Sequence, residues 1–533
     1  MDHSICRGCC HWGAAFLQWV VTRFPGVSVP YTPPTDAPYI RLRDRAATLF
    51  KPRSSCSMNN GFVHEAYRVH DHSMANLLRG FCTRVWRYKG EEPLPCKITR
   101  WPKFERDLRG FPCAALSYQA VVDTALPRRR KLLQAAADSL LLTPICTRDA
   151  AVSTFIKAEK FNWTSKPNAD PRLIQPRSNR FLVAHGRYIK AIEKKIYLAM
   201  SRLQHHPMVA KGFNAEQTGT LLRQKWEMFK DPVCIGLDAS RFDQHVSQDM
   251  LKATHRIYRR FIDSAEFRRL CELQLRNVGY ARCPEGGFKY DVQGRRMSGD
   301  MDTSLGNCVI MCAITYEFCK GWGQIFNNGD DCIIICERNN APNRQDLELH
   351  YAQYGFRIEV EPTVDVFERV EFCQTQPVWA GRWVMTRAPA MMAKDLTYIG
   401  PRESRTQWLD AIGQCGLALT DGVPMMSAFY ASLLTPGVRR KGIKNSMLYS
   451  CGFTRLAEGM TYQARPITAG ARLSFYRAFG VEPQMQYAAE LAMAPAGLIT
   501  NLDETSYCVH LKTSIQYGTS AKSTEVATAT TET

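Results

Sequence analysis

The sequence predicts a protein of the α+β class whose central sheet is antiparallel. Residues 324–326 and 332–336 are short apolar runs on either side of Asn327-Asn328-Gly329, and Asn and Gly tolerate the positive φ angles of tight hairpin turns. Residues 233–237 form a further apolar strand. Helical patterns occupy residues 128–142 and 303–318. With 533 residues the chain is too long for one core, so we expect about two to four structural subregions.

The composition favours a globular protein with a polyanionic partner. Apolar residues make up 45% of the chain and charged residues 22%. The formal net charge is +19 and the pI about 9.2, which favours nucleic acid or an anionic membrane surface. Between residues 151 and 230, 15 Lys and Arg stand against 5 Asp and Glu, a local charge of +10. The basic character is therefore concentrated in one segment.

The 20 cysteines are scattered, many of them inside apolar segments, and no secretory signal is visible. We therefore expect reduced thiols in a cytosolic setting. A metal-like spacing occurs at Cys6, Cys9, Cys10 and His11, but no second Cys/His pair follows at the spacing of a zinc module, so zinc is not favoured. No apolar run approaches the roughly 18–20 residues of a membrane span. The best candidate, residues 12–21, fits a buried helix better than an element lying on a membrane.

Three carboxylates are placed at the ends of predicted strands, and a fourth follows one of them closely. Asp330 and Asp331 follow Gly329 at the tip of the predicted hairpin, and Asp238 ends the apolar strand before it, with Asp243 five residues later. Adjacent carboxylates repel each other unless a cation lies between them, and a hard divalent ion with oxygen ligands fits that position. A solvated Asp-rich turn is the alternative for the isolated Gly-Asp-Asp.

A polar pair interrupts the apolar helix that begins near residue 303. Thr303 and Asn307 are four residues apart, so they share one helix face, and the flexible Ser298-Gly299 loop precedes them. Such groups need a hydrogen-bonding partner, which a nucleotide sugar would supply. Helix capping or hydrogen bonds within the core are equally open.

Two strand-like segments, 155–160 and 171–178, carry basic side chains that we expect to project: Lys157, Lys160, Arg172 and Arg177. Basic groups on strands braced by prolines suit the binding of phosphates better than a flexible tail does. A solvated basic face is the alternative. The helix of residues 128–142 opens with a further basic run of Arg128, Arg129, Arg130 and Lys131.

The remaining patterns complete the α+β prediction. The expected elements are a basic amphipathic helical region at 250–280, a helix at 344–354, a strand at 354–360, and a hairpin built from 370–374 and 379–385. Beyond residue 400 the pattern is mainly helical, and from about residue 515 the sequence is of low complexity. No Gly-x4-Gly-Lys-Ser/Thr phosphate loop occurs, which argues against a fused helicase.

Taken in order, these segments resemble the palm of a viral RNA-dependent RNA polymerase. Asp238-x4-Asp243 resembles motif A, Ser298-Gly299-x3-Thr303-x3-Asn307 motif B, Gly329-Asp330-Asp331 motif C and Phe372-Cys373-Gln374 motif E. The strings DASRFDQHVS, MSGDMDTSLGNC, NNGDDC, FIKAEK, PRLIQPRS and VEFCQTQPV are most similar to plant positive-strand viruses of the tombusvirus, carmovirus and umbravirus group. The resemblance covers roughly residues 125–400.

The resemblance implies a right-hand polymerase with fingers, palm and thumb, an antiparallel palm sheet and closed fingertips. The implied domains are an N-terminal extension at 1–100, fingers with basic motif F at 101–230, a palm with motifs A to E at 231–385 (251–296 partly fingers), a helical thumb at 386–512, and a disordered tail at 513–533.

It also implies a two-metal nucleotidyl transfer. Asp238, Asp330 and Asp331 would hold two Mg²⁺ ions, with Mn²⁺ able to substitute. Nucleotide binding would fall to Asp243, Thr303 and Asn307 at the ribose, Ser298 and Gly299 in the adjustable loop, and Lys157, Lys160, Arg172 and Arg177 of motif F. Residues 128–131 would contact RNA.

Two departures accompany the resemblance. Asp302 stands where close relatives are expected to carry Asn. Arg357 is nearest to the position of the lysine that often acts as general acid before the motif D strand, and its pKa is too high for that role, so the acid stays unassigned. The competing classes are a reverse transcriptase and a non-enzymatic basic RNA-binding protein.

The implied partners are a viral RNA template with its nascent strand and nucleoside triphosphates. An auxiliary viral replication protein and, indirectly, host membranes complete the expectation. The implied location is a membrane-associated replication complex in the host cytoplasm, with attachment through the N-terminal region, a fused upstream segment or a partner protein.

Overall fold

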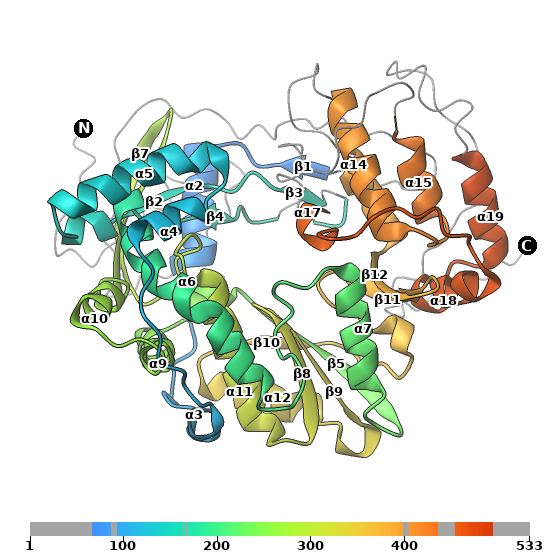
Figure 1. Cartoon of the computed structure of the whole chain (residues 1–533), viewed down its shortest axis with the longest axis horizontal. Helices are drawn as coiled ribbons and strands as arrows, with labels where there is room; N and C mark the ends of the chain where they lie inside the picture. The colour runs from blue at the N-terminus through green and yellow to red at the C-terminus, as the bar shows by residue number, and fades with distance from the viewer. Residues whose placement is uncertain are drawn as a thin grey trace, which may run out of the picture. The chain divides into compact units, whose positions relative to one another are not determined.

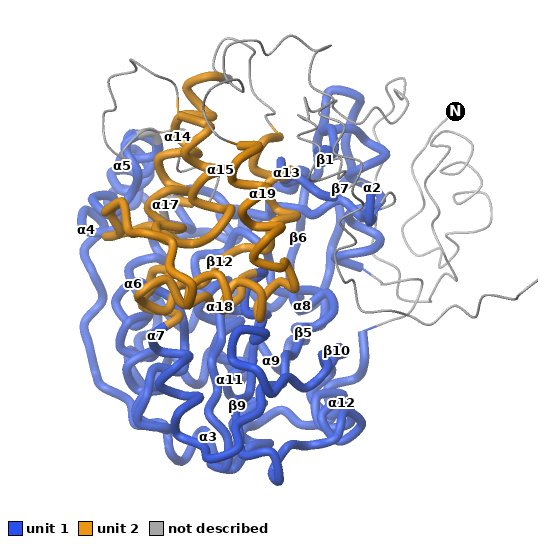
Figure 2. Tube along the Cα trace, turned by 90° about the vertical axis from the view of Figure 1, so that its right-hand side faces the viewer, with its two compact units in different colours: residues 1–56, 65–213, 220–374 blue, residues 57–64, 214–219, 375–533 orange. Residues whose placement is uncertain are grey.

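The computed structural model describes residues 67–86, 93–162, 164–166, 169–397, 405–434 and 453–493. The chain divides into two compact units (Figure 2). Unit 1 comprises residues 1–56, 65–213 and 220–374, and unit 2 residues 57–64, 214–219 and 375–533. The Cys6, Cys9, Cys10 and His11 cluster, residues 12–21 and the tail at 513–533 lie outside the described residues.

Unit 1 is built around an antiparallel sheet with the strand order β10-β5-β9-β8 (Figure 1). These strands are β10 (Ile358–Val360), β5 (Pro232–Ala239), β9 (Asp331–Glu337) and β8 (Gly323–Asn328). The inner residues of β5 and β9 are buried on both faces, which explains why their sequences are continuous apolar runs instead of alternating ones. The predicted central antiparallel sheet is confirmed.

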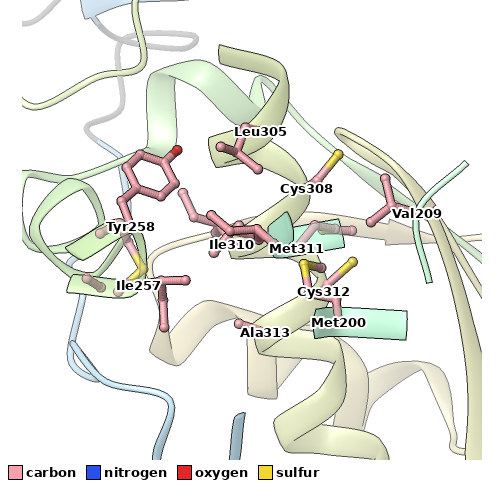
Figure 3. Close-up of a cluster of buried hydrophobic side chains, with 14 of the residues drawn as sticks. Met200, Val209, Ile257, Tyr258, Leu305, Cys308, Ile310, Met311, Cys312 and Ala313 are labelled. Atoms are coloured by element: carbon pink, nitrogen blue, oxygen red, sulfur yellow. The ribbon is translucent and has the colours of Figure 1, made fainter. Parts of the chain in front are cut away.

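Helix α11 (Thr303–Cys319) packs against β8 and fills the core behind the sheet. Almost all of its residues are buried, and Figure 3 shows its Leu305, Cys308 and Met311 among side chains of other segments. Tyr258 on α9 (Gln248–Arg259) and Met200 on α6 (Asn179–Ser201) belong to this cluster. A helix that is apolar on every side is stable only when it is enclosed in this way.

A second sheet in unit 1 has the order β4-β2-β6-β7. It contains β4 (Leu173–Ile174), β2 (Val152–Ile156), β6 (Arg276–Cys283) and β7 (Gly286–Gln293). The pair β2 and β6 is parallel and the other two pairs are antiparallel. A short antiparallel pair joins β1 (Tyr67–Val69) to β3 (Lys160–Asn162).

The predicted helical region at 250–280 is wrong in its second half. Helix α9 ends at Arg259, and Ser264 caps a separate helix, α10 (Ala265–Glu272), by accepting a hydrogen bond from the Phe267 amide. Strand β6 then begins at Arg276, with the alternating burial of a half-exposed strand. The leucines before β6 fit a helical spacing as well as a strand spacing, so the sequence did not indicate where the helix ends.

The remaining elements of unit 1 are helices. They are α2 (Met74–Phe81), η1 (Cys82–Trp86), α3 (Pro102–Asp107), α4 (Tyr118–Asp123), α5 (Pro127–Leu142), η2 (Thr147–Ala150), α8 (Phe242–His245), η3 (Arg338–Asn340), α12 (Arg344–Gln353) and η4 (Phe367–Arg369). Helix α7 (Ala215–Trp226) begins in unit 2 and ends in unit 1. The predicted helices at 128–142 and 344–354 are confirmed by α5 and α12.

Unit 2 is mainly helical beyond residue 400, as predicted. Its elements are β11 (Thr375–Trp379), β12 (Trp383–Arg387), η5 (Pro389–Met391), α13 (Met392–Leu396), α14 (Arg405–Thr420), α15 (Met426–Ser432), α17 (Phe453–Leu456), α18 (Ala469–Phe479) and α19 (Pro483–Ala492). The predicted hairpin is displaced: β11 pairs with β12, and residues 370–374 are not part of it. Cys373 and Gln374 both have positive φ, which breaks the extended conformation before β11.

The described residues bear on the expected reduced thiols and on the expected lack of a membrane span. The 14 cysteines placed there are free thiols. Among the same residues, no helix has the length and apolar character needed to cross a bilayer.

Candidate active site

The hairpin between β8 and β9 is closed by a two-residue turn. Asn328 is the last residue of β8 and pairs with Asp331, which leaves Gly329 and Asp330 as the turn. Gly329 has φ +92°, a conformation that suits glycine. Asn327 is buried in β8, where its side chain binds the Gly329 amide and the Gly329 and Asp331 carbonyls. The predicted hairpin is confirmed, with its tip one step further along the chain.

The register of the sheet brings the predicted acids together at one end. Asp238 on β5 lies opposite Asp331 on β9, and Glu359 on β10 lies opposite Asp238 on its other side. All three reach solvent, yet partial burial and the charge of Asp330 raise the pKa of Asp238. Partial burial and Asp330 also raise the pKa of Asp331 to about 6. The carboxylates therefore repel each other, and a cation would relieve that repulsion.

The donor chemistry at this end of the sheet fits a hard divalent cation. Asp330 lies in the turn, Asp331 begins β9 and Asp238 lies on the paired strand β5. Carboxylate oxygens are the ligands that Mg²⁺ prefers. They are not gathered into a finished cage: in the part of the chain that the structure describes, no group of three or more His, Cys, Asp or Glu side chains is arranged to hold a metal ion. The acids are thus suitable ligands whose side chains would have to converge.

A second polar contact joins motif A to motif B. The Asn307 Nδ2 donates a hydrogen bond of 2.9 Å to the Asp243 Oδ1. Burial raises the pKa of Asp243 to about 6. The Asn307 Oδ1 is buried and has no hydrogen-bond partner among the described residues. An acceptor in this state can receive a hydroxyl donor from a ligand.

Thr303 is the first residue of α11, one turn before Asn307. Its hydroxyl donates to the Met297 carbonyl at 2.8 Å and so closes the loop that enters α11, which is the capping alternative left open by the sequence. The loop is also held by the residue after β4, since the backbone amide of Gln175 donates to the Ser298 carbonyl at 2.8 Å. A Cβ on Gly299 would lie 2.6 Å from the Pro176 nitrogen, so glycine is required for this close approach.

The predicted basic strand side chains fall into two kinds. Lys157 follows β2 and forms an ion pair of 2.7 Å with Glu159, while Arg172 is about half exposed and lies 3.5 Å from the same Glu159. Lys160 begins β3, so residues 155–160 are the ends of two strands and not one. Lys157 and Arg172 thus share one carboxylate, that of Glu159.

Arg177, in contrast, does not project as predicted. Its guanidinium is buried and forms a bidentate pair with Asp300, at 2.7 and 3.0 Å. It also donates to the Asn277 side chain and the Ala150 carbonyl. The expectation that Arg177 projects from the strand is therefore wrong, because its guanidinium is enclosed among these acceptors in the interior.

At the start of α5 the basic run points outward where it can be described. Arg129, Arg130 and Lys131 are exposed, and the side chain of Arg128 lies outside the described atoms. Pro127 at the first helical position sets the start of the helix.

Three contacts in this region could not be predicted from the sequence. The segment before Lys211 is hydrogen-bonded to the Asn327 backbone of β8. The positive charge of Lys211 lowers the pKa of Asp331, whereas burial raises it. Asp302 is buried and paired with Arg296 at 2.6 Å, so the acid in place of the expected Asn has a structural partner. Cys373 contacts the turn. No local pattern signals these contacts, because each joins segments far apart in the sequence.

Comparison with known proteins places this site in context. A family model described as viral RNA dependent RNA polymerase matches residues 41–500. The chain is 39% identical over 491 residues to an RNA-directed RNA polymerase of groundnut rosette virus (strain MC1), covering 89% of the chain and 58% of the relative. It is 38% identical to the corresponding protein of melon necrotic spot virus, covering 80% of the chain and 56% of the relative. It is 39% identical to that of tobacco necrosis virus (strain A), covering 80% and 62%. The chain thus spans less than two thirds of the length of these relatives.

Proposed function

The chain belongs to the viral RNA-dependent RNA polymerase family, and from this premise we propose that it copies a positive-strand viral RNA genome by template-directed nucleotidyl transfer. The observation that carries the proposal is the meeting of Asp238, Asp330 and Asp331 at one end of an antiparallel sheet. The neighbouring Asn307–Asp243 contact supports it. It fixes the Asn307 side chain and leaves the Asn307 Oδ1 able to accept a hydrogen bond from a ligand hydroxyl.

The right-hand layout extends this proposal to the domains. Residues 101–230 would form the fingers, 231–385 the palm and 386–512 the thumb, with the fingertips closing the hand. The antiparallel sheet in unit 1 and the mainly helical unit 2 support the assignment. The division between the units falls at Gln374/Thr375, earlier than the proposed end of the palm.

Polymerases of this family generally use divalent metal ions. Here Asp238, Asp330 and Asp331 would hold two Mg²⁺ ions, or Mn²⁺ in their place. When bound, such ions lower the pKa of the attacking 3′-hydroxyl and neutralise the charge that develops on pyrophosphate. Asp238 and Asp331 would be fixed as ligands by the paired strands β5 and β9, and Asp330 would be presented by the adjoining turn.

The remaining residues would bind and select the nucleotide. Asn307, held by Asp243, would accept a hydrogen bond from the ribose 2′-hydroxyl. Ser298 and Gly299 would border the template and nucleotide, and Thr303 would hold that loop. Lys157, Lys160 and Arg172 would bind the triphosphate, and the exposed start of α5 would contact RNA.

The direct test is incorporation of labelled rNTPs on a short RNA template, with and without EDTA. We expect template-dependent product with Mg²⁺, its loss on chelation, and its return with Mg²⁺ or Mn²⁺. Incorporation of dNTPs instead would favour a reverse transcriptase. RNA binding that is unchanged by EDTA, with no product under any metal condition, would favour a non-enzymatic RNA-binding protein.

Asn307→Ala is expected to relax the choice of sugar. The lost acceptor removes one hydrogen bond that only a ribonucleotide makes, so the preference for UTP over dUTP should fall by about tenfold. Single-nucleotide extension gives the ratio of kcat/KM values. Asn343→Ala, which removes an exposed N-cap asparagine on α12, is the matched control and should leave the ratio unchanged. An unaltered ratio in Asn307→Ala would contradict the assignment.

The proposed setting is a membrane-associated replication complex in the host cytoplasm. Its partners would be the viral RNA, nucleoside triphosphates and an auxiliary viral replication protein that supplies the link to host membranes. Adding the other viral replication proteins to the incorporation assay tests the partner. A rise in product, or recruitment of the chain to sedimenting vesicles only when they are present, would support it.

A further inference from the structure

Residues 208–211, which precede α7, run along β8, the last strand of the central sheet. Val209 forms a parallel bridge with Asn327 of β8. Two hydrogen bonds of 2.9 and 2.8 Å close the bridge, and they join the Asn327 backbone to the residues on either side of Val209. Because paired parallel segments advance together, this register brings Lys211 to the level of Gly329, the first residue of the turn between β8 and β9.

Lys211 is presented at the tip of a tight turn of its own. The Phe213 amide donates to the Ala210 carbonyl at 3.2 Å, which closes a four-residue turn with Lys211 and Gly212 at its centre. Gly212 has φ +92°, the conformation that a type II turn requires of its third residue. The Lys211 side chain is exposed, and its ammonium forms no ion pair with any residue that the structure describes. Its positive charge is therefore available to a ligand.

Basic groups approach the acids from two sides of the sheet. Asp243 follows β5, whereas Lys211 lies beside β8, and β9 separates these two strands. Burial raises the pKa values of Asp243 and Asp331, and a different cation opposes this rise at each acid. Arg172 does so at Asp243, and Lys211 does so at Asp331. Since Asp243 and Asn307 define the proposed nucleotide site, Lys211 lies across the acids from it.

We propose that Lys211 binds a backbone phosphate near the 3′ end of the nascent RNA strand and so helps to place its 3′-hydroxyl beside the acids. The inference rests on the proposed function, because it assigns a contact with one substrate of that reaction. Two polyanions meet at such a centre, namely the triphosphate of the incoming nucleotide and the strand that is extended. Motif F accounts for the triphosphate on the side of Asp243. Lysine binds phosphate as a point charge on a flexible stem, which suits a strand that moves after each addition.

The first measurement is the binding of a primed RNA template, in which a short primer stands for the nascent strand, followed by fluorescence anisotropy. Lys211→Met should raise the Kd by about three- to tenfold and lower the slope of log Kd against log salt by about one, as expected for loss of one phosphate contact. Lys211→Arg keeps the charge and should stay within about twofold of wild type. Binding of the unprimed template should change by less than about twofold in either variant. The matched control is Lys252→Met, which removes an exposed lysine on α9.

Neutral methylphosphonate linkages in the primer identify the phosphate that Lys211 contacts. They are placed one at a time at the last three positions. One of them should weaken binding to wild type as much as Lys211→Met does, and should weaken binding to Lys211→Met no further. Additive losses at all three positions would overturn the proposal, and so would wild-type affinity for the primed template in Lys211→Met. A raised KM for UTP with unchanged primer binding would also overturn it and would place Lys211 at the triphosphate.

The binding measurements need no catalysis, so the two proposals can fail separately. A wild-type protein that shows the coupled loss but incorporates no nucleotide would refute the proposed polymerase activity and retain the Lys211 contact. Templated incorporation by wild type, with primed RNA bound equally by wild type and Lys211→Met, would retain the activity and refute the contact.

Discussion

Asp330→Ala is expected to lower templated incorporation by at least about 10³-fold, because it removes a carboxylate that we propose to bind the catalytic metal ions. Binding of RNA should be retained and is expected to be slightly tighter, since a negative charge is removed from a surface that meets phosphates. Asp330 lies in the two-residue turn and has few packing contacts to lose, so the fold should persist. Single-turnover incorporation and filter binding, measured on the same preparations, separate the two effects.

The control for Asp330→Ala is Asp249→Ala. Asp249 is an exposed acid in the first turn of α9, and its ion pair with Lys252 at 3.5 Å is of the weak surface kind. Incorporation by this variant should remain within about twofold of wild type. If Asp330→Ala lost RNA binding and incorporation to the same degree, the acids would be structural and the two-metal assignment would fail.

The parts of the site that could be predicted from the sequence follow local rules. Gly329 beside two acids between apolar runs specifies a hairpin with charges at its tip, whatever the rest of the chain does. The start of α11 at Thr303 follows from the end of a Ser-Gly loop and the start of an apolar period. In both cases the determining residues are neighbours in the chain.

The parts that could not be predicted depend on which distant segment lies alongside. The hairpin was expected at 370–385, but the positive φ angles of Cys373 and Gln374, which the residue types do not suggest, shift it to β11 and β12. The contact of Cys373 with the turn joins residues about 45 apart in sequence. The burial of Arg177 could not be predicted for the same reason, because nothing in the segment PRLIQPRS distinguishes it from the exposed Arg172.

The contrast between those two arginines leads to a prediction of opposite phenotypes. Arg177→Met should lower the free energy of unfolding by about 3–5 kcal/mol, because it leaves the buried Asp300 carboxylate without its guanidinium partner. The Asp300 side chain would keep only the 3.0 Å hydrogen bond from the Gln274 Nε2, which does not compensate a buried charge. Arg172→Met should change stability by less than about 0.5 kcal/mol and should instead raise the KM for nucleotides, since its guanidinium is half exposed.

Urea unfolding followed by circular dichroism gives the stability of each variant, and steady-state incorporation gives the KM. The double variant Arg177→Met/Asp300→Asn provides the discriminating control, because removing both charges avoids the unpaired carboxylate and should recover part of the lost stability. An Arg177→Met protein that is as stable as wild type but needs far more nucleotide would show that the guanidinium leaves Asp300 and binds phosphate after all. The same result would return Arg177 to the basic surface on which its neighbour Arg172 lies, and it would identify the Arg177–Asp300 pair as a resting state of the loop that contains Ser298 and Gly299.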